Sequence, residues 1–123
     1  MSNPNYVILY VDNPIHSANF YSDLLNKEPI ESSPTFVLFE LESGIKLGLW
    51  SKHSVEPAAD AESGGGFELA ISVSNNEQVH RIYEQWKAKG LTLIQEPIMM
   101  DFGLNFVAVD PDSHRLRVFA LAR

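Results

Sequence analysis

Cysteine is absent from the 123-residue sequence, which excludes disulfides and thiolate chemistry and is typical of a cytoplasmic protein. Basic residues are also few: nine Lys and Arg stand against 16 Asp and Glu, for a net charge of -7. Binding to phosphates requires a basic face, so we expect no nucleic-acid partner. No apolar run reaches the length of a membrane span, and the N-terminal residues do not resemble a signal peptide. We therefore expect a cytoplasmic protein without membrane association.

Large apolar residues are scarce in the segment 51–66, which contains three alanines and three consecutive glycines. This composition is typical of a flexible connection. A chain of this length forms one domain, residues 1–123. We therefore expect a single domain built from a first module, residues 1–50, a linker, residues 51–66, and a second module, residues 67–123.

The first module begins with a β-rich run, 6–11, that stops before Asn13 and Pro14. Asn13 can cap a helix in which Pro14 takes the first position, where a missing N–H costs nothing. Apolar residues at helical spacing continue this helix to residue 26. The remaining expected strands are 36–41, 45–50 and a short edge strand near 29–34.

The second module repeats this order with a strand at 68–73 and a helix at 76–89. Asn75 can cap the helix, and Gly90 ends it. Three strands follow, at 92–96, 104–109 and 114–121, and residues 98–103 are expected to form a loop.

The two modules align at nearly fixed offsets. Asn75 stands 62 positions after Asn13, and Phe119 stands 69 positions after Trp50. The same βαβββ order found twice indicates an internal duplication in an α+β fold. Each module alone is a sheet covered by one helix on one face, so its other face must find a partner surface.

Three segments, 11–14 with 17–25, 72–75 and 109–118, resemble the vicinal-oxygen-chelate (glyoxalase/bleomycin-resistance/dioxygenase) superfamily. The resemblance implies two tandem βαβββ modules that form curved mixed sheets around a cavity, paired in a homodimer that shares each cavity between chains. Residues 20–29 and 48–51 are most similar to metal-free drug-binding resistance proteins of the phenazine and bleomycin type. The resemblance therefore implies a small aromatic molecule as the ligand.

Enzymes of this superfamily hold a divalent metal at four strand positions, which correspond here to Tyr6, Gly48, Glu68 and Arg117. Only Glu68 is a good ligand, because glycine offers no side chain and Arg117 is a fixed cation. The four histidines, His16, His53, His80 and His114, fall at none of these positions and lack metal-site spacing. We expect no metal, no other cofactor and no catalytic residues.

Strand alternation assigns further residues to the face that each helix leaves uncovered. If Glu68 and Arg117 both lie there, we expect them to pair in a partly dry cavity; the alternative is that both turn to solvent. The same alternation brings inward Ile8, Tyr10, Lys46, Trp50, Arg115 and Phe119. The residues expected to bind the ligand are Tyr6, Tyr10, Gly48, Trp50, Glu68, Met100, Phe102, Arg117 and Phe119.

Two groups of apolar residues complete this set. Met99, Met100 and Phe102 lie in the expected loop 98–103 and could act as an adaptable lid. Phe36, Phe39 and Phe106 are expected in the core, where strand aromatics usually lie. Trp50 ends a strand before the linker, which favours ligand contact over plain packing.

Three functions remain open. The first is non-enzymatic binding and sequestration of a planar aromatic compound, as in antibiotic resistance. The second is a glyoxalase-like lyase or dioxygenase-like enzyme with an atypical or absent metal site, in which Glu68 acts as a base and Arg117 as an anion clamp. The third is a structural or ligand-sensing protein whose cavity is filled by its own side chains. The sequence favours the first, because it contains no triad, phosphate loop or nucleophile motif.

Overall fold

The computed structural model describes residues 3–59 and 66–122. The chain divides into two compact units, residues 1–63 and 64–123, and each is described by itself. Among the described residues, no helix is long and apolar enough to cross a membrane.

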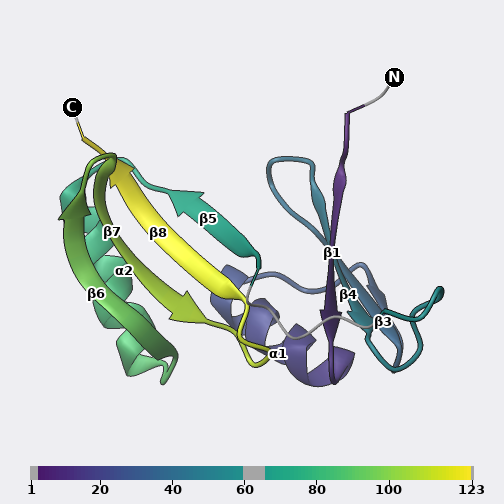
Figure 1. Cartoon of the computed structure of the whole chain (residues 1–123). Helices are drawn as coiled ribbons and strands as arrows, with labels where there is room; N and C mark the ends of the chain where they lie inside the picture. Colours follow the sequence, from purple (N-terminus) through teal and green to yellow (C-terminus); the bar gives the residue numbers. More distant parts are fainter. Residues whose placement is uncertain (1–2, 60–65, 123) are drawn as a thin grey trace. The chain divides into compact units, whose positions relative to one another are not determined.

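The first unit contains one helix and one four-stranded sheet (Figure 1). In chain order its elements are β1 (Tyr6–Val11), α1 (Pro14–Leu25), β2 (Glu31–Ser32), β3 (Phe36–Glu40) and β4 (Lys46–Ser51). The strands are ordered β1-β4-β3-β2, with β1 parallel to β4 and the other pairs antiparallel. This confirms the expected mixed sheet, with β2 as a short edge strand.

Helix α1 begins and ends as the sequence predicts. The Asn13 side chain accepts a hydrogen bond from the His16 backbone N–H at 3.1 Å, and Pro14 takes the first helical position. Asn26 ends the helix in the left-handed region, with φ at 54°. On the inner face, Ala18 and Tyr21 are buried, whereas Ile15, which the periodicity also placed there, is 41% exposed.

The core of the first unit lies between α1 and the alternate strand residues that face it. It comprises Leu9, Val11, Val37, Phe39, Leu47 and Leu49, each at most 3% exposed.

The second unit repeats this topology. Its elements are β5 (Glu68–Ser72), α2 (Asn76–Ala88), β6 (Thr92–Met100), β7 (Gly103–Val109) and β8 (Arg115–Leu121). The strand order is β5-β8-β7-β6, again with one parallel pair, β5 with β8. Its register reproduces that of the first unit. In the first unit Ile8 pairs with Gly48. In the second unit Ala70, 62 positions after Ile8, pairs with Arg117, 69 positions after Gly48. The duplication inferred from the sequence is therefore present in the register of the strands.

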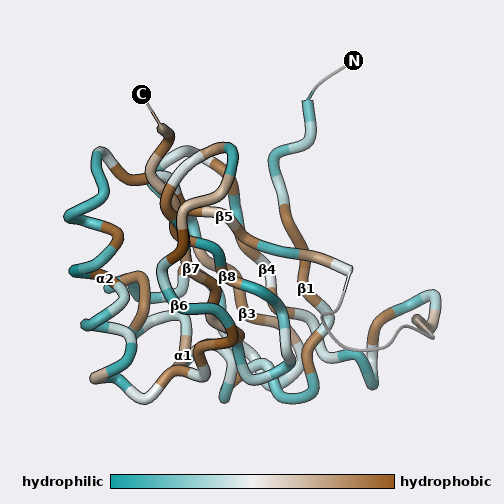
Figure 2. Tube along the Cα trace, turned by 60° about the vertical axis from the view of Figure 1, so that its left-hand side comes forward, coloured by the Kyte–Doolittle hydropathy of each residue, from teal (hydrophilic) through white to brown (hydrophobic). Residues whose placement is uncertain are grey.

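Helix α2 packs against β6, β7 and β8 (Figure 1). Asn75 caps it by accepting from the Gln78 backbone N–H at 3.0 Å, and Val79 and Trp86 are its buried residues. The remaining positions are largely polar, as the mixed hydrophilic and hydrophobic segments of α2 show in Figure 2. The Trp86 ring packs edge-on against Phe106, which is fully buried. Phe39 and Phe106 are thus core residues, as expected.

The prediction of a loop at 98–103 is wrong for residues 98–100, because β6 continues to Met100. Among residues 98–103, Asp101 and Phe102 form the turn. Pro97 does not end the strand. Strand β6 is the edge of its sheet and pairs only with β7, so an N–H is dispensable on its outer side. Its register shifts on both sides of Gln95, which accommodates the irregular backbone.

The beginning of the predicted linker is ordered. Ser51 is the last residue of β4, a turn follows it, and the Val55 side chain is 4% exposed. Residues 60–65, with two of the three consecutive glycines, lie outside the described residues.

Candidate functional site

In each unit one face of the sheet is left uncovered by the unit's own helix. We call these the first open face, carried by β1, β3 and β4, and the second open face, carried by β5, β7 and β8. Several large apolar side chains on the first open face remain accessible, with exposed fractions of 49% for Tyr6, 38% for Ile8 and 40% for Tyr10. Strand β1 is hydrophobic along much of its length (Figure 2).

An aromatic cluster of three residues occupies the first open face. The half-buried Trp50 ring meets Tyr10 at 6.5 Å and Phe36 at 6.1 Å between ring centroids, both edge-to-face. The core assignment of Phe36 is therefore wrong. Phe36 is the register partner of Trp50, so both side chains point to the same side of the sheet. The sequence held the signal, because Phe36 and Phe39 are three apart in one strand and must face opposite sides.

Gly48 provides room for these side chains. A Cβ atom at Gly48 would lie 2.9 Å from Ile8 Cδ1 and 3.1 Å from the Phe36 ring, so the Phe36 ring rests directly on the backbone of β4. On the same face, the Lys46 ammonium lies 5.4 Å from the centroid of the Tyr6 ring, in a cation–π contact. Of the predicted residues, Tyr6, Tyr10, Gly48 and Trp50 thus share the first open face.

The second open face carries an ion pair. Arg117 donates from Nε to Glu68 Oε2 at 2.9 Å and from Nη2 to Glu68 Oε1 at 3.2 Å. This two-bond geometry matches the planar fork of a guanidinium to a carboxylate. The side chains are 17% and 36% exposed for Arg117 and Glu68, respectively. The pairing expected from strand alternation is present.

Asn105 of β7 extends this ion pair into a network that the sequence interpretation missed. Its Oδ1 accepts from Arg117 Nη1 at 2.6 Å and from Gln95 Nε2 at 2.9 Å, and its Nδ2 donates to the carbonyls of Ile98 at 3.2 Å and Gly103 at 3.3 Å. Asn105 is fully buried. A guanidinium can only donate, so the Asn105 amide points its oxygen at Arg117 and its N–H groups at the two carbonyls. A lone polar residue in the apolar run 103–109 was the available signal.

Aromatic side chains lie beside this network. Phe119 follows Arg117 by two positions on β8 and pairs in register with Asn105, so all three residues belong to the second open face. The Phe102 ring lies edge-to-face with Phe119 at 5.9 Å between centroids. Met100 ends β6 and is 44% exposed. Of the predicted residues, Glu68, Met100, Phe102, Arg117 and Phe119 thus belong to the second unit.

The turn between β7 and β8 is held by a buried pair. Asp110 Oδ2 lies 2.7 Å from His114 Nδ1, and Asp110 Oδ1 accepts from the backbone N–H groups of Asp112 and His114. Ser113 adopts the left-handed region, with φ at 68°. This arrangement closes the turn and directs Arg115 and Arg117 into β8.

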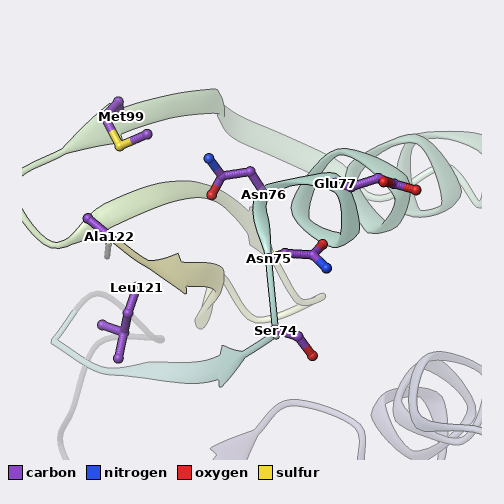
Figure 3. A pocket seen from close by; sticks show the side chains of 7 residues that line it. All are labelled: Ser74, Asn75, Asn76, Glu77, Met99, Leu121 and Ala122. Carbon is purple, nitrogen blue, oxygen red and sulfur yellow. The ribbon is translucent and has the colours of Figure 1, made fainter.

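A surface hollow of about 590 Å³ lies elsewhere in the second unit (Figure 3). Its lining residues are Ser74, Asn75, Asn76, Glu77, Met99, Leu121 and Ala122. The polar groups at the start of α2 largely serve the helix itself, since Asn75 caps it and Gln78 Oε1 accepts from the Ser74 backbone N–H at 3.2 Å. None of the predicted ligand-binding residues lines this hollow.

The chain belongs to the Glyoxalase/Bleomycin resistance protein/Dioxygenase superfamily, whose sequence model matches residues 3–118. It is 31% identical over 121 residues to the "Phenazine antibiotic resistance protein EhpR" of Enterobacter agglomerans, covering 96% of this chain and 92% of that protein.

Two solved structures share the fold. The solution structure of protein ATC0852 from Agrobacterium tumefaciens is 55% identical, with a TM-score of 0.90 over the whole of both chains. A glyoxalase/bleomycin resistance protein/dioxygenase from Nocardioides is 23% identical, with a TM-score of 0.85 over 100% of this chain and 87% of that chain, and shares the fold.

The superfamily's metal does not fit the residues at its four strand positions. Gly48 has no side-chain ligand atom, and Arg117 is a cation whose guanidinium bonds both oxygens of Glu68, the one good side-chain ligand. Tyr6 stacks beneath the Lys46 ammonium, a second positive charge. Within residues 3–59 and 66–122, no three side chains of His, Asp or Glu gather as a metal site would require.

Proposed function

We propose that this protein binds a planar aromatic compound on its open faces and sequesters it without transforming it. The observation that carries this proposal is the aromatic cluster of Trp50, Tyr10 and Phe36 on the first open face. Aromatic side chains that remain partly exposed on a concave or open surface favour stacking with a flat ring. Side chains that merely fill a core are fully buried, as Phe39 is.

The resistance protein from Enterobacter agglomerans supports a tricyclic ligand. Its name refers to phenazine, a flat, fused aromatic system of the kind that an indole ring can stack against. The aromatic pair Phe102 and Phe119 on the second open face adds a further apolar surface of the same character. We therefore take phenazine as the probe for the experiments below.

The ion pair favours binding over catalysis. Glu68 is the carboxylate that could act as a general base, but both of its oxygens already accept hydrogen bonds from Arg117. A general base must lie within hydrogen-bond reach of the proton that it abstracts, and the two bonds to Arg117 hold the Glu68 carboxylate in one orientation, toward the guanidinium. Arg117 is likewise held in place by hydrogen bonds to Glu68 and Asn105. Two side chains held in this way are better suited to contact a ligand than to transfer a proton.

The test is fluorescence quenching of Trp50 by phenazine. The chain has two tryptophans, so the measurement uses a Trp86→Phe background, in which Trp50 is the sole indole. Trp86 is 6% exposed and packs inside the second unit, so phenazine should quench its emission little in a matched Trp50→Phe protein. Saturable quenching of Trp50 alone is expected. Equal quenching of both tryptophans, or none, would contradict the proposal.

We further propose that the protein is a homodimer. Exposed apolar residues on β1 and at the end of β6, among them Ile8 and Met99, favour burial against a second copy. Sedimentation equilibrium at micromolar concentration should give about twice the chain mass of 13.8 kDa. A single species of the chain mass would exclude it.

A further inference from the structure

We infer that Arg117 binds a hydrogen-bond acceptor oxygen, a carboxylate or a carbonyl, on the edge of the aromatic ligand. This inference rests on the proposed function and specifies the class of ligand. Its basis is the set of Arg117 N–H groups that make no hydrogen bond within the network on the second open face.

The guanidinium has more donors than its protein partners use. A guanidinium carries five N–H groups. Its bonds to the described residues are one from Nε and one from Nη2 to Glu68, and one from Nη1 to Asn105. Five minus three leaves one N–H on each terminal nitrogen, and the side chain, which lies on the open face, is 17% exposed.

The position of these two donors is fixed before any ligand binds. Glu68 holds one side of the guanidinium through two bonds, and Asn105 holds Nη1. The amide of Asn105 cannot flip, because its Nδ2 is committed to the carbonyls of Ile98 and Gly103. Asn105 is therefore a positioning residue, and a pre-organised fork costs little entropy when it receives an acceptor.

The neighbouring aromatic surface explains why the acceptor should be attached to a flat ring. Phe119 lies two residues beyond Arg117 on the same face of β8, with Phe102 against it. A planar ligand on Phe119 therefore presents its edge toward the guanidinium. Glu68 offsets the charge of Arg117, so hydrogen bonding, rather than net charge, selects the ligand.

Three probes test the inference: phenazine, phenazine-1-carboxylate and phenazine-1-carboxamide. Hydrogen bonds to a charged donor in a partly dry site favour both substituted probes over the parent compound by about tenfold or more. In Arg117→Met this preference should disappear, and the three affinities should converge on that of phenazine. Calorimetric titration gives the affinities, because it does not depend on an indole beside the ligand, and circular dichroism verifies that each variant is folded.

Arg115 provides the matched control. It lies on the same strand and the same face, and it lines a hollow of about 440 Å³ with Gly66, Phe67 and Glu68. Unlike Arg117, its side chain donates no hydrogen bond to Glu68 or Asn105. Arg115→Met removes the same charge and should leave the preference unchanged. If Arg117→Met does not fold, Arg117→Lys replaces it: a Lys retains the charge and can donate, but it lacks the planar fork, so the preference should be reduced.

The outcomes separate this inference from the proposed function. Binding of phenazine with no preference for the substituted probes overturns the inference and leaves the proposed function standing. A preference that Arg115→Met abolishes as fully as Arg117→Met also overturns it, because the cause is then general charge or the Arg115 hollow. Binding of none of the three probes overturns both.

Discussion

Replacement of Trp50 by alanine separates a ligand-binding indole from a structural one. In the structure Trp50 is half-buried, and its ring has two edge-to-face partners, Tyr10 and Phe36. Such aromatic pairs contribute about 0.5–1.5 kcal/mol each beyond area burial, so the loss of the two pairs in Trp50→Ala should by itself reduce the free energy of unfolding by about 1–3 kcal/mol. The loss of a stacking surface should reduce affinity for phenazine by roughly tenfold to a hundredfold.

Trp86→Ala is the internal reference for this experiment. Trp86 is buried against Phe106 on the helix side of the second sheet, and truncation of such a core residue costs about 3–5 kcal/mol. Urea unfolding and calorimetric phenazine titration are measured on both variants, since the calorimeter does not depend on indole emission. Unchanged phenazine affinity in Trp50→Ala, with a stability loss as large as that of Trp86→Ala, would refute the reasoning and return Trp50 to the core.

Three further predictions concern the network, the turn and the loop after β4. Asn105→Ala should reduce the free energy of unfolding by about 2–4 kcal/mol in urea denaturation, because it removes the four hydrogen bonds of a buried amide, among them the one that Arg117 donates. A loss below about 1 kcal/mol would contradict this. Ser113→Gly should raise the free energy of unfolding by about 0.5–1 kcal/mol and increase the melting temperature. A left-handed φ costs an L-residue about 1–2 kcal/mol, and the greater chain entropy of glycine in the unfolded state offsets only part of this gain. An unchanged or lower melting temperature would contradict the prediction. The hydrogen bond from His53 holds the pKa of the exposed Asp12 carboxyl below its ordinary value, so the pair's stabilisation is present above about pH 4 and is lost as the pH falls through the lowered pKa. In His53→Ala, carboxyl titration by NMR should show the Asp12 pKa returning upward, and an unaltered titration curve would exclude His53 as the cause.

Much of the fold follows from local sequence signals. Both helix caps, Asn13 and Asn75, were identifiable because a short polar side chain precedes an amphipathic run. The repeated offset then identified which positions of the two units correspond, and the strand registers reproduce this correspondence. Such features depend on neighbours in sequence or on a repeat, so one chain suffices to find them.

Strand β6 shows where local signals fail. The sequence interpretation ended this strand at residue 96 and made 98–103 a loop, yet the strand continues through Pro97 to Met100. Whether proline is tolerated depends on which side of the strand lacks a partner, and this is a property of the sheet edge and not of the local sequence. Met99 and Met100, which the sequence suggested as part of a lid, therefore belong to the edge strand of a sheet.

Local sequence signals likewise predict one part of the candidate site and fail for another. Strand alternation placed Glu68 and Arg117 on one face, since parity is a local property, and their ion pair followed from their charges. The contribution of Asn105 was not accessible in this way, because its amide bonds reach across to β6, where the register shifts twice between Leu93 and Ile98. These shifts determine which carbonyl meets the amide, and the bonds that result fix the oxygen of Asn105 on Arg117. The orientation of the guanidinium, and with it the expected preference for an acceptor-bearing ligand, thus depends on a backbone irregularity in an edge strand that no residue pattern specifies.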